Sequence, residues 1–64
     1  MIRINGEDTA ADGMKLTEWL SSQGLDEKRV AVMINGSIVT KDSYESTVFQ
    51  DGDEADIIGF VGGG

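Results

Sequence analysis

The sequence predicts an α+β fold in which an antiparallel or mixed sheet of four to five strands packs on one helix. Two Asn-Gly pairs, at 5–6 and 35–36, each divide a run of strand-forming residues, which is typical of two-residue hairpin turns. Between these hairpins, residues 16–20 show helical spacing, and a final apolar run closes the sequence. This ββαββ order describes a sheet that buries one face against a helix.

The first hairpin is expected over residues 1–10. Ile2 and Ile4 flank Arg3, so the two isoleucines point to one face of a strand and the arginine points to the other. A two-residue turn then sets Asp8 opposite Arg3, which predicts a cross-strand ion pair.

The helix is expected to include residues 16–20. Leu16, Trp19 and Leu20 lie at i, i+3 and i+4 and therefore share one side of a helix. Gly24 is placed to end the helix in a left-handed conformation, with Leu25 packing back on Leu20. Because isolated helices of this length are marginal in water, this one must dock on the sheet.

A second hairpin is expected over residues 30–39, at the centre of the sheet. Residues 30–34 are apolar without interruption, which is typical of a buried strand. The Asn-Gly pair then returns the chain through residues 37–39.

The rest of the chain is expected to complete the core and the sheet. Residues 41–44 suit a short helical turn, and Val48 with Phe49 is expected at the edge of the core. An Asp-Gly-Asp turn at 51–53 leads into the last strand, over residues 54–61.

The composition narrows the functional classes. Five basic against twelve acidic residues give a formal charge of −7, which repels nucleic acids and anionic membranes and favours protein partners with basic surfaces. The chain has no cysteine and no histidine, so thiolate and imidazole catalysis are excluded. The acidic residues at 51–56 match no EF-hand loop, and we expect no metal site. We therefore expect no enzyme activity of the chain alone.

The chain also shows no sign of a membrane segment. No stretch approaches the roughly 18 apolar residues that a transmembrane helix needs, and the N-terminus has no signal-peptide pattern. No linker, repeat or second domain is apparent. We expect a soluble, cytoplasmic protein that is a monomer when free.

The last three residues are glycines, Gly62, Gly63 and Gly64. Fully extended, three residues reach ~10 Å, far enough to pass through the wall of a partner's active site. Because glycine has no Cβ, such a tail fits a narrow slot and exposes the terminal carboxylate of Gly64 as a reactive group. The sequence thus predicts a domain over residues 1–61 and a flexible tail over residues 62–64. The alternative is a frayed end or a cloning remnant.

Taken together, these features resemble the β-grasp, ubiquitin-like sulfur carriers, and most closely the thiamin-pathway members of that ThiS/MoaD-like group. The resemblance rests on an apolar strand with its Asn-Gly turn, the Asp-Gly-Asp turn, and an apolar run that ends in glycines. These are residues 30–39, 51–54 and 57–64. Two positions depart from the pattern. Thr40-Lys41 stands where members often have Pro followed by a basic residue, and the expected helix start has Met14-Lys15 in place of a good cap.

The resemblance implies a chemistry centred on the C-terminus. In this family an activating enzyme of the ubiquitin E1-like type uses ATP and Mg²⁺ to adenylate the last glycine, here Gly64, while Gly62 and Gly63 thread its active site. Sulfur from a persulfide, supplied through a cysteine desulfurase, then leaves a thiocarboxylate on Gly64. Thiazole synthase accepts this sulfur to build the thiazole ring of thiamin. The carrier itself binds no cofactor and is a co-substrate, not an enzyme.

Three other roles remain open from the sequence. The small subunit of molybdopterin synthase uses the same kind of tail, although such chains are typically longer. A ubiquitin-like modifier would join Gly64 to a target lysine through an isopeptide bond. An inert β-grasp binding domain would not need its tail at all.

Strand alternation also predicts a docking surface. Because Asp56 must face water, Ile58 and Phe60 lie on the same outward side of the last strand. Met33 faces outward from its own strand, and a two-residue turn pairs it with Ile38. We call Met33, Ile38, Ile58 and Phe60 the outer-face patch, and we expect it to bind a protein partner. The simpler alternative is that these are scattered surface residues of no special function.

Overall fold

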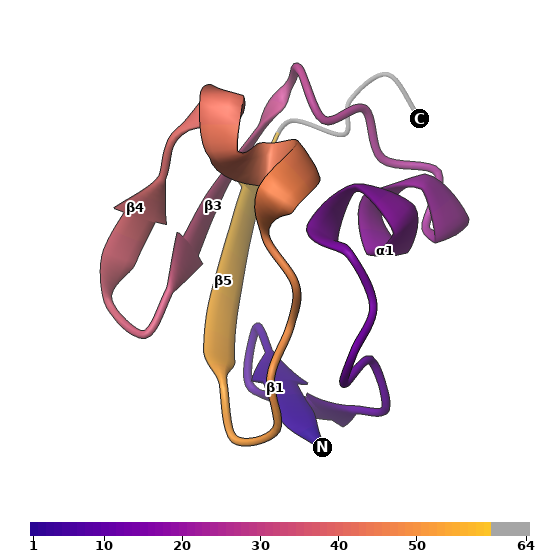
Figure 1. Ribbon diagram of the computed structural model, residues 1–64, viewed down its shortest axis with the longest axis vertical. Coiled ribbons are helices and arrows are strands. Elements are labelled where there is room, and N and C mark those ends of the chain that lie inside the picture. Colours follow the sequence, from indigo (N-terminus) through magenta and orange to yellow (C-terminus); the bar gives the residue numbers. More distant parts are fainter. Residues whose placement is uncertain (60–64) are drawn as a thin grey trace.

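The computed structural model describes residues 1–59, and in this part of the chain five strands form one sheet with a helix across it (Figure 1). A short 3₁₀-helix precedes the last strand. The elements in chain order are β1 (Ile2–Ile4), β2 (Glu7–Thr9), α1 (Leu16–Ser22), β3 (Val30–Ile34), β4 (Ser37–Val39), η1 (Lys41–Ser46) and β5 (Glu54–Gly59). The predicted α+β fold, with a mixed sheet on one helix, is confirmed. No helix within residues 1–59 is long and apolar enough to cross a membrane.

The sheet has the strand order β2-β1-β5-β3-β4, so β5 occupies its centre (Figure 1). β5 runs parallel to β1 and antiparallel to β3, and thereby joins the two hairpins into one sheet. The prediction that the second hairpin lies at the centre is therefore wrong, because β4 is an edge strand. The apolar residues of β3 misled this prediction, since only Val30 and Val32 are buried while Ala31 is exposed and Met33 is half-buried.

Both Asn-Gly turns form as expected. Asn5 and Asn35 adopt φ values of 52° and 53°, and the glycines that follow them have φ values of 85° and 82°. Positive φ at both central residues matches the twist of a hairpin. The first turn places Arg3 opposite Asp8, and their Nε and Oδ1 atoms are 3.5 Å apart. Both side chains are exposed, so this predicted ion pair adds little stability.

The two turn asparagines also hold β5. The side-chain carbonyl of Asn5 accepts a hydrogen bond from the Ile57 N–H at 2.9 Å. That of Asn35 accepts one from the Glu54 N–H at 3.0 Å, and its amide donates to the Asp53 carboxylate at 3.0 Å. Asn5 thus extends the ladder between β1 and β5 at the point where β1 turns away. Each turn therefore fixes both a hairpin and the position of the central strand.

The core lies between the inner face of the sheet and α1. Leu16 and Leu20 are buried as predicted, together with Phe49. Trp19 is half-buried, and its ring meets that of Phe49 edge-on at a centroid distance of 6.2 Å. Val48 is 39% exposed, so only the phenylalanine of the predicted Val48-Phe49 pair enters the core. The buried apolar residues are Ile2, Ile4, Ala11, Leu16, Leu20, Val30, Val32, Tyr44, Phe49 and Ala55.

The helix ends are set by backbone hydrogen bonds. Gly24 has a φ of 72°, and the Leu25 N–H donates to the Leu20 carbonyl at 2.9 Å, which is the predicted Schellman ending. At the other end the Glu18 carboxylate accepts a hydrogen bond from the Lys15 N–H at 3.3 Å. The Leu16 N–H donates to the Thr47 carbonyl at 2.9 Å, because the chain after η1 runs beside the helix start.

The α-amino group of Met1 joins two separate loops. It lies 2.8 Å from an Asp12 carboxylate oxygen and 2.6 Å from one of Asp51. Hydrogen bonds to these two carboxylates raise the pKa of the Met1 amino group from 8.0 to about 10. The same contact lowers the pKa of Asp12 below its ordinary value. This cluster fastens the start of β1 to the loops before α1 and before β5.

The pH dependence of stability should report this cluster. Because the pKa of the Met1 amino group is raised on folding, its stabilising effect is complete below about pH 8 and lost as the pH rises through about 10. Because the pKa of Asp12 is lowered on folding, the stabilising contribution of its carboxylate is present above the ordinary pKa of 3.8. It is lost as the pH falls below that value. Thermal melts of the wild type should therefore show a melting temperature that declines across the alkaline window.

The matched control is the Asp12→Asn, Asp51→Asn double variant. It lacks both carboxylates and should lose less melting temperature between about pH 7 and about pH 10. Parallel declines in the two proteins would show that the cluster contributes nothing.

Candidate functional site

The candidate site lies where β5 ends, because the predicted reactive residues follow directly after Gly59. The tail residues Gly62, Gly63 and Gly64, together with Phe60, lie outside the described residues. The structure instead defines the strand that leads to them and the surfaces around its end. In this region β5 pairs with β3, and the last pair is Gly59 with Val30.

The backbone carbonyl of Val30 is held by two side chains from η1. The Tyr44 hydroxyl donates to it at 2.9 Å and the Lys41 ammonium at 2.8 Å. Lys41 also donates to the Glu27 carbonyl at 2.8 Å, and its Nζ lies 5.1 Å from the centroid of the Tyr44 ring. Three contacts thus converge on one ammonium group beside the start of β3.

The strand register explains why this carbonyl needs such partners. Val32 pairs with Val39, so Val30 would pair with Lys41 if β4 continued. The chain instead enters η1 at Lys41, which leaves the Val30 carbonyl without a ladder donor at the sheet. The side chains of Lys41 and Tyr44 supply the missing donors. Burial raises the pKa of Tyr44 above its ordinary value, so its hydroxyl remains a donor at neutral pH.

The outer face of the sheet gathers three of the four predicted patch residues. Met33 lies directly opposite Ile38, as the turn predicted. Ile58 lies opposite Ala31 and is one diagonal step from Met33, whose own partner on β5 is Asp56. Ile38 is 74% exposed and Ile58 56%, whereas Met33 is half-buried. The structure thus places these side chains on one face, and their role in docking stays a prediction.

Ala31 is the residue that the sequence reasoning missed on this surface. It is exposed, lies two residues before Met33 on β3 and is the cross-strand partner of Ile58. It has the same strand parity as Met33, so the alternation of β3 was sufficient to find it. Its small side chain therefore lies beside Met33 and Ile58 on the outer face of the sheet.

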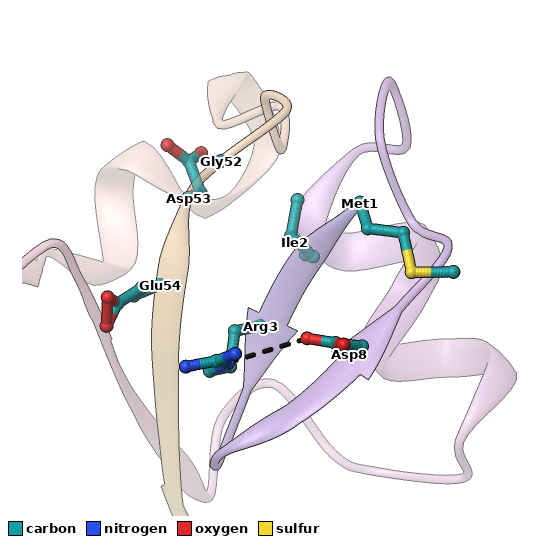
Figure 2. Close-up of a pocket in the computed structure, with 7 residues that line it drawn as sticks. All are labelled: Met1, Ile2, Arg3, Asp8, Gly52, Asp53 and Glu54. Carbon is teal, nitrogen blue, oxygen red and sulfur yellow. Dashed lines mark ion pairs between the residues drawn. The ribbon is translucent and has the colours of Figure 1, made fainter.

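The opposite end of β5 is charged, not apolar. A hollow of about 200 Å³ opens there, with Arg3 flanked by Asp8 on one side and Glu54 on the other (Figure 2). It is lined by Met1, Ile2, Arg3, Asp8, Gly52, Asp53 and Glu54. Within residues 1–59 no group of three acidic side chains is arranged to hold a metal ion. This hollow lies beside the first residue of β5, at the far end from Gly59, and is not part of the candidate site.

This arrangement defines the chain as a β-grasp protein of the ubiquitin-like class, in which the central strand leads into the final residues. The comparisons with known proteins identify the family. The ThiS family model matches residues 2–64, and the chain therefore belongs to the ThiS family.

Individual relatives agree with this assignment. The chain is 35% identical over 66 residues to the sulfur carrier protein ThiS of Bacillus subtilis, with all of both chains covered. It matches the crystal structure of the thiamine biosynthesis protein ThiS from Geobacter metallireducens with a TM-score of 0.76 and 30% identity, covering 98% of this chain and 97% of that one.

A longer relative contains a similar segment. The chain is 40% identical over 62 residues to a thiazole synthase of Paramagnetospirillum magneticum, which covers 95% of this chain. The chain spans only 19% of the length of that relative. A segment similar to this chain thus occurs within a protein named as a thiazole synthase.

The contacts around Val30 can be tested by substitution. Tyr44→Phe removes one donor from a buried carbonyl that keeps Lys41, so we expect a loss of about 0.5–1.5 kcal/mol in the free energy of unfolding. Lys41→Met removes the other donor. The double variant should lose more than the sum of the two single losses, because only then is the carbonyl left without either side-chain donor.

The measurement is urea denaturation of the four proteins as a double-mutant cycle. Additive losses would show that the two donors do not share the Val30 carbonyl in solution. The Ser46→Ala variant, which changes another exposed residue of η1, should have a much smaller effect.

Proposed function

We propose that this chain carries sulfur as a thiocarboxylate on Gly64 and delivers it to thiazole synthase. The observation that carries the proposal is that the ThiS family match extends through residue 64 and so includes the glycine tail. We further propose that residues 1–61 form the folded domain and residues 62–64 the working tail. In this role the chain is a co-substrate and performs no catalysis itself.

The chemistry of the terminus explains why activation is needed. A C-terminal carboxyl group has an ordinary pKa near ~3.5, so at neutral pH it is an anion that nucleophiles do not attack. Transfer of AMP from ATP, with release of pyrophosphate, turns one carboxylate oxygen into part of a leaving group. The terminal sulfur of a persulfide then displaces AMP. A thiol then attacks the sulfur of the resulting acyl disulfide that is not bound to the acyl group. This forms a new disulfide and releases the thiocarboxylate.

The composition is consistent with this division of labour. The sequence contains no cysteine, so no side chain of the carrier can hold sulfur as a persulfide. We therefore assign ATP and Mg²⁺ to an E1-like activating enzyme and the persulfide to a cysteine desulfurase route. The carrier contributes its terminal carboxylate and the surface by which these enzymes hold it.

We assign this surface to the outer-face patch. Ile38 on β4 and Ile58 on β5 are large apolar side chains exposed on the outer face of the sheet. An exposed apolar cluster with acidic neighbours such as Asp56 suits a partner with an apolar centre and a basic rim. The charge of −7 would increase the rate of encounter with such a partner.

Intact-mass measurement tests the proposed modification. Incubation with the activating enzyme, ATP, Mg²⁺ and a persulfide donor should replace one oxygen of the chain by one sulfur. The three methionines complicate the measurement, because oxidation to a sulfoxide adds nearly the same mass. Fragment spectra must therefore locate the change at Gly64, and a reaction without ATP is the control. Conjugates of higher mass would indicate a protein modifier instead.

Charge insertion tests the docking surface. Ile38→Asp places a carboxylate at a patch position that is 74% exposed and should lower kcat/KM for adenylation on the order of 10-fold, through KM. The matched control is Ala10→Asp, which adds the same charge at an exposed position outside every strand and helix. Equal effects of the two variants would assign the loss to net charge and remove the patch from the proposal.

A further inference from the structure

Gly59 differs from every other glycine that the structure describes. The glycines of the turns and of the helix end all have positive φ, and a Cβ added to any of them would meet nothing within 4 Å. Gly59 has no such backbone requirement, yet a Cβ there would lie 2.5 Å from Val30 Cγ1 and 3.1 Å from Val30 Cα. Glycine at this position therefore provides space for a close approach between two strands.

Val30 is poorly able to make room for an added side chain. It is 3% exposed and belongs to the core, and its β-branched side chain has little rotamer freedom. Its backbone carbonyl is fixed by Tyr44 and Lys41. The clash of an added side chain at position 59 with Val30 would therefore be relieved mainly by movement of the end of β5 away from β3. The pairing of Gly59 with Val30 is the last contact of β5 before residue 60.

We propose that Gly59 is a positioning residue for the carrier reaction, because its close contact with Val30 fixes the place and direction in which the chain leaves the sheet. This inference rests on the proposed function. Gly64 follows five residues later, a reach of at most ~18 Å at 3.6 Å per residue, so the exit point limits where the carboxylate can be delivered. Reactions of this kind lose much of their rate when a reacting group is misplaced by about 1 Å.

The test is ATP-dependent pyrophosphate release by the activating enzyme, measured at varied concentrations of full-length carrier. Gly59→Ala should lower kcat on the order of 10-fold while KM changes little, because the exposed apolar side chains remain. Val30→Ala removes Cγ1, the atom that the new Cβ would approach most closely, and leaves Val30 Cβ at 3.0 Å. The double variant Gly59→Ala, Val30→Ala should therefore recover kcat to within about 2-fold of Val30→Ala alone.

The control for stability is Gly36→Ala, at a turn glycine with φ of 82° and open space around it. It should lower the melting temperature yet leave kcat unchanged. A kcat loss equal to that of Gly59→Ala would show that lost stability explains the effect, and would overturn the proposal. A wild-type kcat in Gly59→Ala, or no recovery in the double variant, would also overturn it.

Failure of the proposed function has a different signature. If the wild type itself releases no pyrophosphate and gains no sulfur, the carrier role fails. Amide hydrogen exchange then still tests the structural basis, since Gly59→Ala should raise exchange at the end of β5 at least several-fold, and the double variant should reverse it. Unchanged exchange in Gly59→Ala would contradict the proposed close contact whatever the function.

Discussion

The whole structure depends on how the central strand is held between two hairpins that are far apart in the sequence. Asn5 and Asn35 each form a hairpin turn and also accept a hydrogen bond from a backbone N–H of β5. The side chain of a turn residue thus adds a hydrogen bond between its hairpin and the neighbouring strand β5. Within residues 1–59 every buried side-chain polar atom has a hydrogen-bond partner, including the Tyr44 hydroxyl, so the core contains no unpaired polar side chain. The small sheet is therefore specified by its turns as much as by its core.

Most local structure followed from the sequence because local chemistry decides it. Positive-φ residues located both hairpins, and the spacing of Leu16, Trp19 and Leu20 located the helix. Strand parity correctly placed Ile58 and Met33 on the outer face. These features depend on a few neighbouring residues, so a single sequence contains the information that determines them.

Long-range features were less accessible. The order of the strands depends on the insertion of β5 between the two hairpins, and no local pattern encodes that placement. The burial of Tyr44 was not predicted because its hydroxyl is satisfied by a carbonyl that becomes available only where β4 ends. From the sequence, Gly59 is only a residue of low strand propensity, and its close contact with Val30 is evident only once the strand pairing is known. The tail residues were identified from sequence alone and lie outside the described part of the chain.

The central place of β5 has a mechanical consequence. A pull on the end of β5 acts along a strand that pairs antiparallel with β3 over residues 55–59 and parallel with β1 only at residues 54–55. A force along the strand loads all of its interstrand hydrogen bonds at once. A force that pulls an edge strand away sideways breaks its hydrogen bonds one after another. Tension applied at this end is therefore carried by β5, the central strand of the sheet.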